Sequence, residues 1–108
     1  MSILVIAEHD NSNLKGSTLN TVAAASILEG DIHILVAGSG IDSVVSESQT
    51  LDGVSKVISC DSETYLNFIA EDLSELVVSI SNNYTHILAP ATTFGKNLMP
   101  RISAKLDS

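Results

Sequence analysis

Short apolar runs of strand length alternate along this chain with segments in which apolar residues recur at helical spacing. The runs cover residues 3–7, 32–37, 57–60 and 86–89, and polar residues rarely interrupt them. Strands of a parallel sheet have this composition, because helices cover both faces of the sheet. The pattern therefore predicts an α/β domain with a mainly parallel sheet.

The segments between these runs are expected to form helices. The first should begin near Ser17 or Thr18, whose hydroxyls suit a helix cap, and should end at Gly30, which readily adopts a left-handed conformation. The next two helices each carry one buried stripe at positions i, i+3, i+4 and i+7. These stripes are Ile41, Val44, Val45 and Ser48 in the second helix, and Leu73, Leu76, Val77 and Ile80 in the third.

The last helix is constrained by Pro100, because a proline in a helix interior removes a backbone hydrogen bond. A proline is tolerated in the first turn, so this helix is expected to begin around Asn97. Leu98, Ile102 and Leu106 then form its buried stripe. No strand-like run follows, and the sheet is therefore expected to lack its closing strand.

Length and composition favour a single globular domain that spans residues 1–108. Hydrophobic residues make up 44% and charged residues 17% of the chain, and no apolar run reaches the roughly 18 residues of a membrane span. Thirteen acidic residues against five Lys and Arg give a net charge of −8, which would repel nucleic acid. The single cysteine, Cys60, suits a reducing compartment, so the cytoplasm is the expected location.

The segment "AGSGIDS", residues 37–43, resembles part of a dinucleotide-binding fingerprint. Gly38 and Gly40 match its first two glycines, and Asp61 lies about twenty positions further on, where the fingerprint has an acid for a ribose hydroxyl. Ser43 stands where the third glycine or alanine belongs. A glycine turn before a helix explains the segment more simply, so nucleotide binding by Gly38, Gly40 and Asp61 is kept only as the alternative.

The segment "TTFGKN" has only part of a phosphate-binding loop. Gly95 and Lys96 precede a helix, but Pro90 stands where the motif requires glycine and Asn97 where it requires Ser or Thr. We therefore interpret the segment as a loop that leads into the last helix.

The segment "EHDN" places Glu8, His9 and Asp10 at the carboxyl end of the first strand, where open α/β sheets bind ligands. A metal site or an acid/base pair there would need further ligands, and Asp61 is the one obvious candidate. We interpret the segment as a solvated acidic loop.

The remaining reactive side chains are expected to be structural. Cys60 lacks a clear positive environment and is expected to be a small buried residue. His33 and His86 lie in strands and are expected to be partnered core or edge residues. We predict no catalytic, cofactor-binding or metal-binding residue in this segment.

Five blocks of sequence give the chain a resemblance to a known family. They are "LVIAEHDN" at 4–11, "TLNTVAAA" at 18–25, "LVAG" at 35–38, "VSKVI" at 54–58 and "YTHILAPATTFGKNLMPRISAKLD" at 84–107. The chain resembles the N-terminal domain of the electron transfer flavoprotein alpha subunit over essentially its whole length. The resemblance implies a three-layer Rossmann-like fold of the adenine nucleotide alpha hydrolase type.

The resemblance also implies a function that depends on other polypeptides. The family accepts electrons from acyl-CoA dehydrogenases and other dehydrogenases and passes them to a quinone oxidoreductase, as a heterodimer with a beta subunit. Its FAD is held mainly by a C-terminal domain, so this chain is expected to be cut before that domain, to bind no flavin and to be no enzyme. The implied location is the bacterial cytoplasm, or the mitochondrial matrix in a eukaryote. Residues 96–105 are then expected to form a subunit or domain contact, with Lys96 and Arg101 as rim charges.

Overall fold

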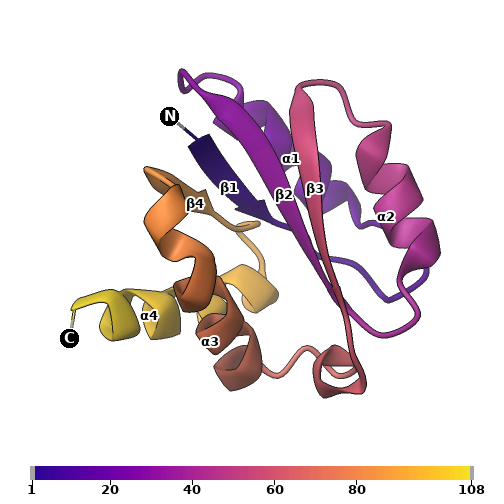
Figure 1. Ribbon diagram of the computed structural model, residues 1–108, viewed down its shortest axis with the longest axis vertical. Helices are drawn as coiled ribbons and strands as arrows, with labels where there is room; N and C mark the ends of the chain where they lie inside the picture. Colours follow the sequence, from indigo (N-terminus) through magenta and orange to yellow (C-terminus); the bar gives the residue numbers. More distant parts are fainter. Residues whose placement is uncertain (1, 108) are drawn as a thin grey trace.

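The computed structural model describes residues 2–107 as a parallel sheet between two layers of helices (Figure 1). This arrangement confirms the predicted three-layer α/β fold. Single 3-10 turns at Glu63–Tyr65 and Ser81–Asn83 flank the third helix. The main elements are β1 (Ser2–Ile6), α1 (Gly16–Ala25), β2 (Asp31–Gly38), α2 (Asp42–Gln49), β3 (Val54–Asp61), α3 (Ala70–Ile80), β4 (His86–Leu88) and α4 (Thr93–Asp107).

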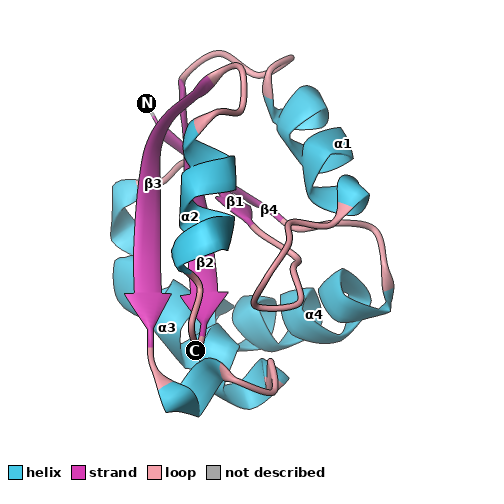
Figure 2. Ribbon diagram, turned by 90° about the vertical axis from the view of Figure 1, so that its right-hand side faces the viewer, coloured by secondary structure: helices cyan, strands magenta, loops and turns pink. Residues whose placement is uncertain are grey.

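The four strands lie in the order β3-β2-β1-β4, and every pair is parallel. The pairing of β1 with β2 runs from Ser2↔Asp31 to Ile6↔Leu35. On its other side β1 pairs with β4, which lies beside it in Figure 2. Successive strands are added on one side of β1 as far as β3, and β4 is then added on the opposite side. In open α/β sheets ligands bind where the direction changes in this way, which is here at the carboxyl ends of β1 and β4.

The two faces of the sheet are covered by different helices, as the unbroken apolar runs predicted. Alternate residues of β1 enter the two cores, Ile3 and Val5 on one side, Leu4 and Ile6 on the other. The first core also contains Val22, Ala25, Ile34, Val36, Ile41 and Val44, from α1, β2, α2 and the residue before α2, and the second contains Leu35, Leu73, Val77, Leu98 and Ile102, from β2, α3 and α4.

The predicted stripes of α2 and α3 face these cores. Val44 and Ser48 of α2 and Leu73 and Val77 of α3 are buried, and Ile41, which immediately precedes α2, is buried as well. The other predicted members of the two stripes are only partly buried and pack at the margins of the cores; they are Val45, Leu76 and Ile80.

Helix α1 is shorter than predicted, because it ends at Ala25 and not at Gly30. The amides of Ile27 and Leu28 bond to carbonyls three residues earlier, which tightens the chain into turns. Ile27 is 84% exposed, so a longer helix would gain no core contact there. Gly30, with φ of 141°, ends this turn before β2.

Helix α4 begins at Thr93, four residues before the predicted start at Asn97. Pro100 is consequently the eighth residue of the helix and lies in its interior, contrary to the sequence prediction. Leu98 and Ile102 are buried as expected, but Leu106 is 47% exposed and does not continue the stripe. Packing of the first turn against the rest of the domain therefore prevails over the local preference of proline.

The position of Pro100 can be tested by Pro100→Ala. An interior proline leaves the carbonyl four residues earlier without its helical partner, and it costs up to about 3 kcal/mol relative to alanine. Greater freedom of the unfolded alanine chain offsets part of this gain, so we expect the free energy of unfolding in urea to rise by about 1–2 kcal/mol. Pro90→Ala is the control, because Pro90 is buried outside the helix and its loss should give no gain. Unchanged stability of Pro100→Ala would contradict an interior position.

Candidate functional site

The carboxylate of Asp61 lies against the glycine turn that follows β2. Its Oδ1 accepts a hydrogen bond from the amide of Gly40 at 3.0 Å, and its Oδ2 accepts one from the amide of Ile41 at 3.4 Å. Asp61 is the last residue of β3, and Gly38 in the turn pairs with it in register. A phosphate at this turn would need the same amides. Asp61 thus takes the place of an anionic ligand and is bonded to the turn itself.

Asn11 occupies a further amide of the same turn. Its side-chain oxygen accepts a hydrogen bond from the amide of Ser39 at 3.0 Å, and its side-chain nitrogen donates to the carbonyl of Leu66 at 3.2 Å. The backbone of Asn11 has a left-handed φ of 73°, a conformation that asparagine tolerates better than most residues. The three amides of residues 39–41 are therefore all bonded to side chains of the protein.

Gly38 is glycine because other residues of the domain approach it closely. A Cβ atom at this position would lie 2.5 Å from Asn11 Oδ1, 2.7 Å from His9 Cε1 and 2.7 Å from Ile41 Cγ2. In a dinucleotide site this space belongs to the pyrophosphate. Here the chain fills it, so the geometry agrees with a structural turn and not with the nucleotide alternative.

His9 is buried, which corrects the prediction that residues 8–11 form a solvated loop. The residue is 4% exposed, and its ring packs edge-on against the ring of Phe68, with the two ring centroids 5.0 Å apart. The ring nitrogen Nδ1 accepts from the amide of Asn11 at 2.9 Å, which leaves Nε2–H to donate to the carbonyl of Ala37 at 2.8 Å. Burial lowers the pKa of His9, and the neutral ring fits both bonds.

Glu8 joins the three elements that meet where the direction of strand order changes. Its Oε1 accepts hydrogen bonds from the hydroxyls of Ser17 at 2.7 Å and Thr92 at 3.0 Å, near the amino ends of α1 and α4. The hydroxyl of Thr18 accepts from the Glu8 amide and donates to the Glu8 carbonyl. Ser17 and Thr18 therefore bind Glu8, which lies just after β1. They do not cap α1, which corrects the prediction that one of their hydroxyls caps this helix. A carboxylate is favourable at helix amino ends, so Glu8 also takes a position that suits an anion.

Beneath this edge the structure has an enclosed apolar cavity of about 10 Å³. A cavity of this size holds about one water molecule, whereas cofactor sites occupy several hundred Å³. The flavin or adenine ring of a nucleotide does not fit it. The cavity is lined by Ile6, Ala7, Leu35, Ala37, Phe68, Leu73, Val77 and Phe94.

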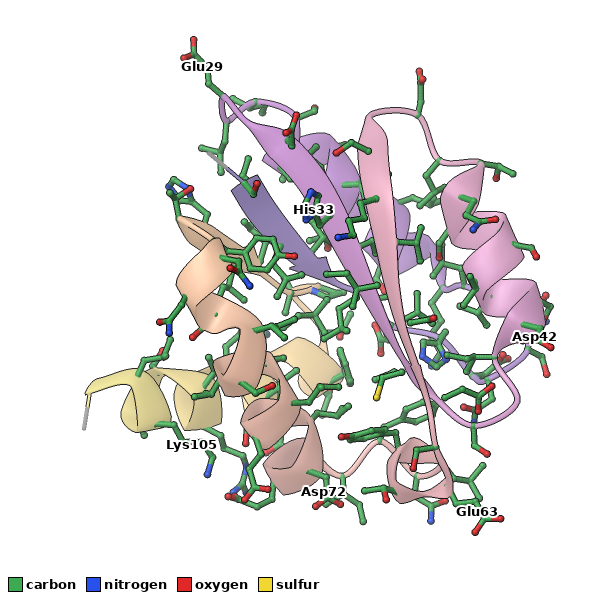
Figure 3. All side chains as sticks on the ribbon, viewed as in Figure 1. Glu29, His33, Asp42, Glu63, Asp72 and Lys105 are labelled. Carbon is green, nitrogen blue, oxygen red and sulfur yellow. The ribbon has the colours of Figure 1, made fainter. Side chains whose placement is uncertain are left out.

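The carboxylates around this edge are dispersed. Asp42, Glu63 and Asp72 project outward at the periphery of the domain in Figure 3. Asp10 binds the amides of Asn13 and Ser12 in its own loop, which lowers the pKa of its carboxyl. Within residues 2–107, His, Cys, Asp and Glu side chains form no group of three that could hold a metal ion.

The other candidate residues have structural contacts. His33 Nδ1 lies 2.9 Å from the hydroxyl of Tyr84, whose pKa is raised by burial, and His86 is exposed in β4. Cys60 is only partly buried, because β3 is an edge strand, and this corrects the prediction that it is a small buried residue. The pKa of Tyr65 is raised, mainly by burial and to a smaller extent by the neighbouring Cys60.

The basic residues of α4 include an intramolecular pair of contacts with α3. Arg101 lies 3.1 Å and Lys105 2.7 Å from the carboxylate of Glu71, and Lys105 is the main cause of a lowered pKa for Glu71. Arg101, expected to be a rim charge, is thus partly engaged within the domain. Lys96 is exposed. Gly95 is buried against the carbonyl of Pro90, which explains the glycine of "TTFGKN" without a phosphate.

Sequence reasoning missed Asn11, Phe68 and Thr92. The hydrogen bonds that give Asn11 and Thr92 their roles join residues 28, 55 and 84 positions apart. Such contacts leave no local periodicity. A local signal existed only for Asn11, since asparagine after an acidic residue is typical of a tight turn.

These contacts define a Rossmann-like α/β domain in which the chain's own side chains bind the backbone donors at the carboxyl ends of the strands. A family model described as the electron transfer flavoprotein domain matches residues 3–108. The chain therefore belongs to the electron transfer flavoprotein family.

Several relatives are alpha subunits by name. The electron transfer flavoprotein subunit alpha of Pseudomonas aeruginosa is 50% identical over 107 residues, which are 99% of this chain and 35% of that protein. The mitochondrial alpha subunit of Dictyostelium discoideum is 41% identical over 96% of this chain, which corresponds to 32% of that protein. The mitochondrial alpha subunit of Arabidopsis thaliana is 39% identical over 99% of this chain, which corresponds to 31% of that protein. The chain thus spans about a third of the length of the curated relatives it matches. Helices long and apolar enough to cross a membrane are absent from the part of the chain that the structure describes.

The packing of Gly38 predicts that Gly38→Ala is strongly destabilising. The new methyl group would overlap Asn11, His9 and Ile41, and overpacking of this kind costs about 1–3 kcal/mol. Gly16→Ala is the control, because a methyl group added there would have no atom within 4 Å and alanine favours a helix. Urea unfolding of both variants measures the difference. A Gly38→Ala protein as stable as the parent would show that the space is open.

The buried state of His9 predicts a stability that falls as the pH is lowered through about 6.5, the ordinary pKa of histidine. The pKa of His9 is lowered in the folded protein, so the unfolded chain takes up a proton first and is favoured in acid. Urea midpoints between pH 5 and 7.5 measure the effect. In His9→Gln this pH dependence should decrease, whereas His86→Gln, at an exposed position, should retain it. Equal pH profiles for the parent and His9→Gln would refute the assignment.

Proposed function

We propose that this chain is a scaffold and subunit-contact domain of an electron transfer flavoprotein alpha subunit. In this role the domain supports a beta subunit and shapes the surroundings of a flavin that other polypeptide holds. The family assignment supports the proposal, and so does the similarity to alpha subunits over 96–99% of the chain. Because the chain spans only about a third of those relatives, the activity belongs to a larger assembly.

One observation carries the proposal furthest, the bond between Asp61 and the amides of Gly40 and Ile41. A domain that bound a dinucleotide here would have to displace this carboxylate and Asn11, and it would also need room beside Gly38. The residues present therefore do not fit the pyrophosphate of FAD or NAD at this turn. The same contacts join the loop after β1 and the end of β3 to the turn after β2.

In the assembly, electrons would pass from acyl-CoA and other dehydrogenases to FAD and then to a quinone oxidoreductase. FAD would be held mainly by a C-terminal domain, and this domain would contribute no catalytic residue. The bacterial cytoplasm is the proposed location, or the mitochondrial matrix in a eukaryotic host. Lys96, exposed beside the turn at Pro90, is the proposed rim charge of a subunit contact.

The proposal predicts that the 108-residue chain binds neither FAD nor adenine nucleotides but does associate with an electron transfer flavoprotein beta subunit. A ligand at a hundred times its Kd would stabilise the fold by about 2.7 kcal/mol, so thermal unfolding with FAD, NAD and AMP detects binding. We expect no shift. Retention of stoichiometric FAD after gel filtration would overturn the scaffold role.

Association with the beta subunit can be measured by titration, with two charge reversals compared. Lys96→Glu should weaken association about fivefold, because it reverses the charge proposed for the rim of the contact. Lys56→Glu, on β3 at the opposite edge of the sheet, is the matched control and should leave the affinity unchanged. An absence of any association would contradict the proposed subunit contact.

A further inference from the structure

The turn between α2 and β3 contains an aspartate that is followed by a glycine, Asp52 and Gly53. Gly53 is the only glycine of the chain that follows an aspartate or an asparagine. An aspartyl side chain can react with the backbone nitrogen of the next residue, because attack of that nitrogen on Cγ closes a five-membered ring. A side chain on the next residue hinders the attack, and glycine has none. The sequence therefore makes Asp52 the aspartate with the least hindered neighbouring nitrogen.

The structure leaves both reacting groups of this turn free and accessible. Asp52 and Gly53 are exposed. Gly53 has a left-handed φ of 88°, and a Cβ atom added to it would meet no atom within 4 Å beyond its chain neighbours. Within residues 2–107, neither the Asp52 carboxylate nor the Gly53 amide forms a hydrogen bond or an ion pair. Ring closure at this turn therefore requires no contact of the folded protein to break.

The residues on either side of the turn are held in place. Leu51 and Val54 pack against the first core, and the amide of Val54 donates to the carbonyl of Leu51 at 3.3 Å. Val54 is the first residue of β3 and pairs with Ile32 at the start of that strand (Figure 1). Asp52 and Gly53 thus project into solvent from a fixed base.

Comparable groups in the loop after β1 are held by hydrogen bonds. The Asp10 carboxylate accepts from the amides of Ser12 and Asn13. The side chain of Asn11 is bonded at both ends, to the amide of Ser39 and the carbonyl of Leu66. The Ser12 amide, which would have to attack Asn11, is the one that donates to Asp10. The loop after β1 is therefore protected in the way that the turn before β3 is not.

We propose that Asp52 is a site of spontaneous covalent modification, at which the aspartate converts to isoaspartate through a succinimide. The Gly53 nitrogen bonds to Cγ of Asp52, and a side-chain carboxyl oxygen leaves as water with the proton of the Gly53 N–H and the proton of the carboxyl group. Water then opens the ring at one of its two carbonyl groups. Opening at the main-chain carbonyl gives isoaspartate, and opening at Cγ restores aspartate. Water is the only other reactant, and nothing is oxidised or reduced.

The product differs from the parent in the path of its main chain. Isoaspartate continues the chain through Cβ and Cγ, so the turn gains one carbon atom between Leu51 and Val54, whose hydrogen bond closes it. The α-carboxylate becomes a side group in an exposed turn, where a methyltransferase that esterifies isoaspartyl carboxylates can reach it. This inference concerns the turn alone and is independent of the proposed function.

Prolonged incubation of the 108-residue chain at physiological temperature, in buffer and in urea, tests the proposal. Endoproteinase Asp-N cleaves before aspartate and not before isoaspartate, so the peptide that spans Asp52 should increasingly escape cleavage there. A protein isoaspartate methyltransferase with a labelled methyl donor should label the same peptide. Asp52 should convert in buffer at no less than about a third of its rate in urea, because no contact protects the turn. Asn11 should convert at least about tenfold more slowly in buffer than in urea, because its loop must open first.

Two substitutions of Asp52 provide matched variants. Asp52→Glu keeps the charge but requires a six-membered ring and one more fixed bond rotation, so methyl labelling of this peptide should fall at least about tenfold. Asp52→Asn forms the same succinimide with loss of ammonia, a better leaving group, and should be labelled faster than the parent. Because the position is exposed, both variants should retain the parent's thermal unfolding midpoint.

Three results would overturn the proposal. The Asp52 peptide could remain free of isoaspartate in buffer while it converts in urea, which would show that the folded turn protects it. Asp52→Glu could be labelled as strongly as the parent, which would place the modification elsewhere in the peptide. Asn11 could also convert in buffer as fast as Asp52, so that the hydrogen bonds of the two turns would not decide where the reaction occurs.

Discussion

The bond between the Asp61 carboxylate and the amides of Gly40 and Ile41 constrains the whole carboxyl edge of the sheet. The turn that leads into α2 would otherwise present these N–H groups to solvent or to an anion. Asp61 comes from the neighbouring strand β3, so the bond also fixes the end of β3 against the turn after β2. A nucleotide-binding position of the fold is thereby converted into a contact within the protein.

At the centre of the sheet, Glu8 likewise holds neighbouring elements together by hydrogen bonds within the protein. β1 is buried on both faces and lies between β2 and β4, so the position of its carboxyl end determines where both neighbours end. The Glu8 side chain binds hydroxyls from the start of α1 and from the residue before α4, while Thr18 satisfies its backbone. Two helices on opposite faces of the sheet are thus held by one residue. His9 continues the arrangement by bonding to β2 through the carbonyl of Ala37.

The layers of the fold could be predicted from sequence, whereas the ends of the elements and the site could not. Apolar strand runs and the stripes of α2 and α3 record burial directly, because burial selects residue type at each position. The predicted start of α4 was wrong because it used a local rule, which places Pro100 in the first turn of the helix. The actual first turn, which begins at Thr93, packs Gly95 against Pro90, and a local rule does not include that contact. The sequence grouped Gly38, Gly40 and Asp61 only as parts of a nucleotide fingerprint, whereas the structure brings them together through a bond of Asp61 to the turn. The bond from the Ser39 amide to Asn11 spans 28 positions and the bond from Thr92 to Glu8 spans 84, and a single sequence does not encode such separations visibly.

The two edges of the sheet differ in a way that matters for assembly. β3 is an eight-residue strand with Lys56 and other exposed polar side chains along it, and such an edge resists pairing with further strands. β4 has only three residues, His86–Leu88, and none of them is Asp, Glu, Lys or Arg. Charge therefore protects the β3 edge of the sheet, whereas β4 carries no comparable row of charged side chains. At the carboxyl edge of the sheet the backbone and hydroxyl donors are bonded to Asp61, Asn11 and Glu8, so this edge is held together by contacts within the protein and not by a ligand-binding arrangement.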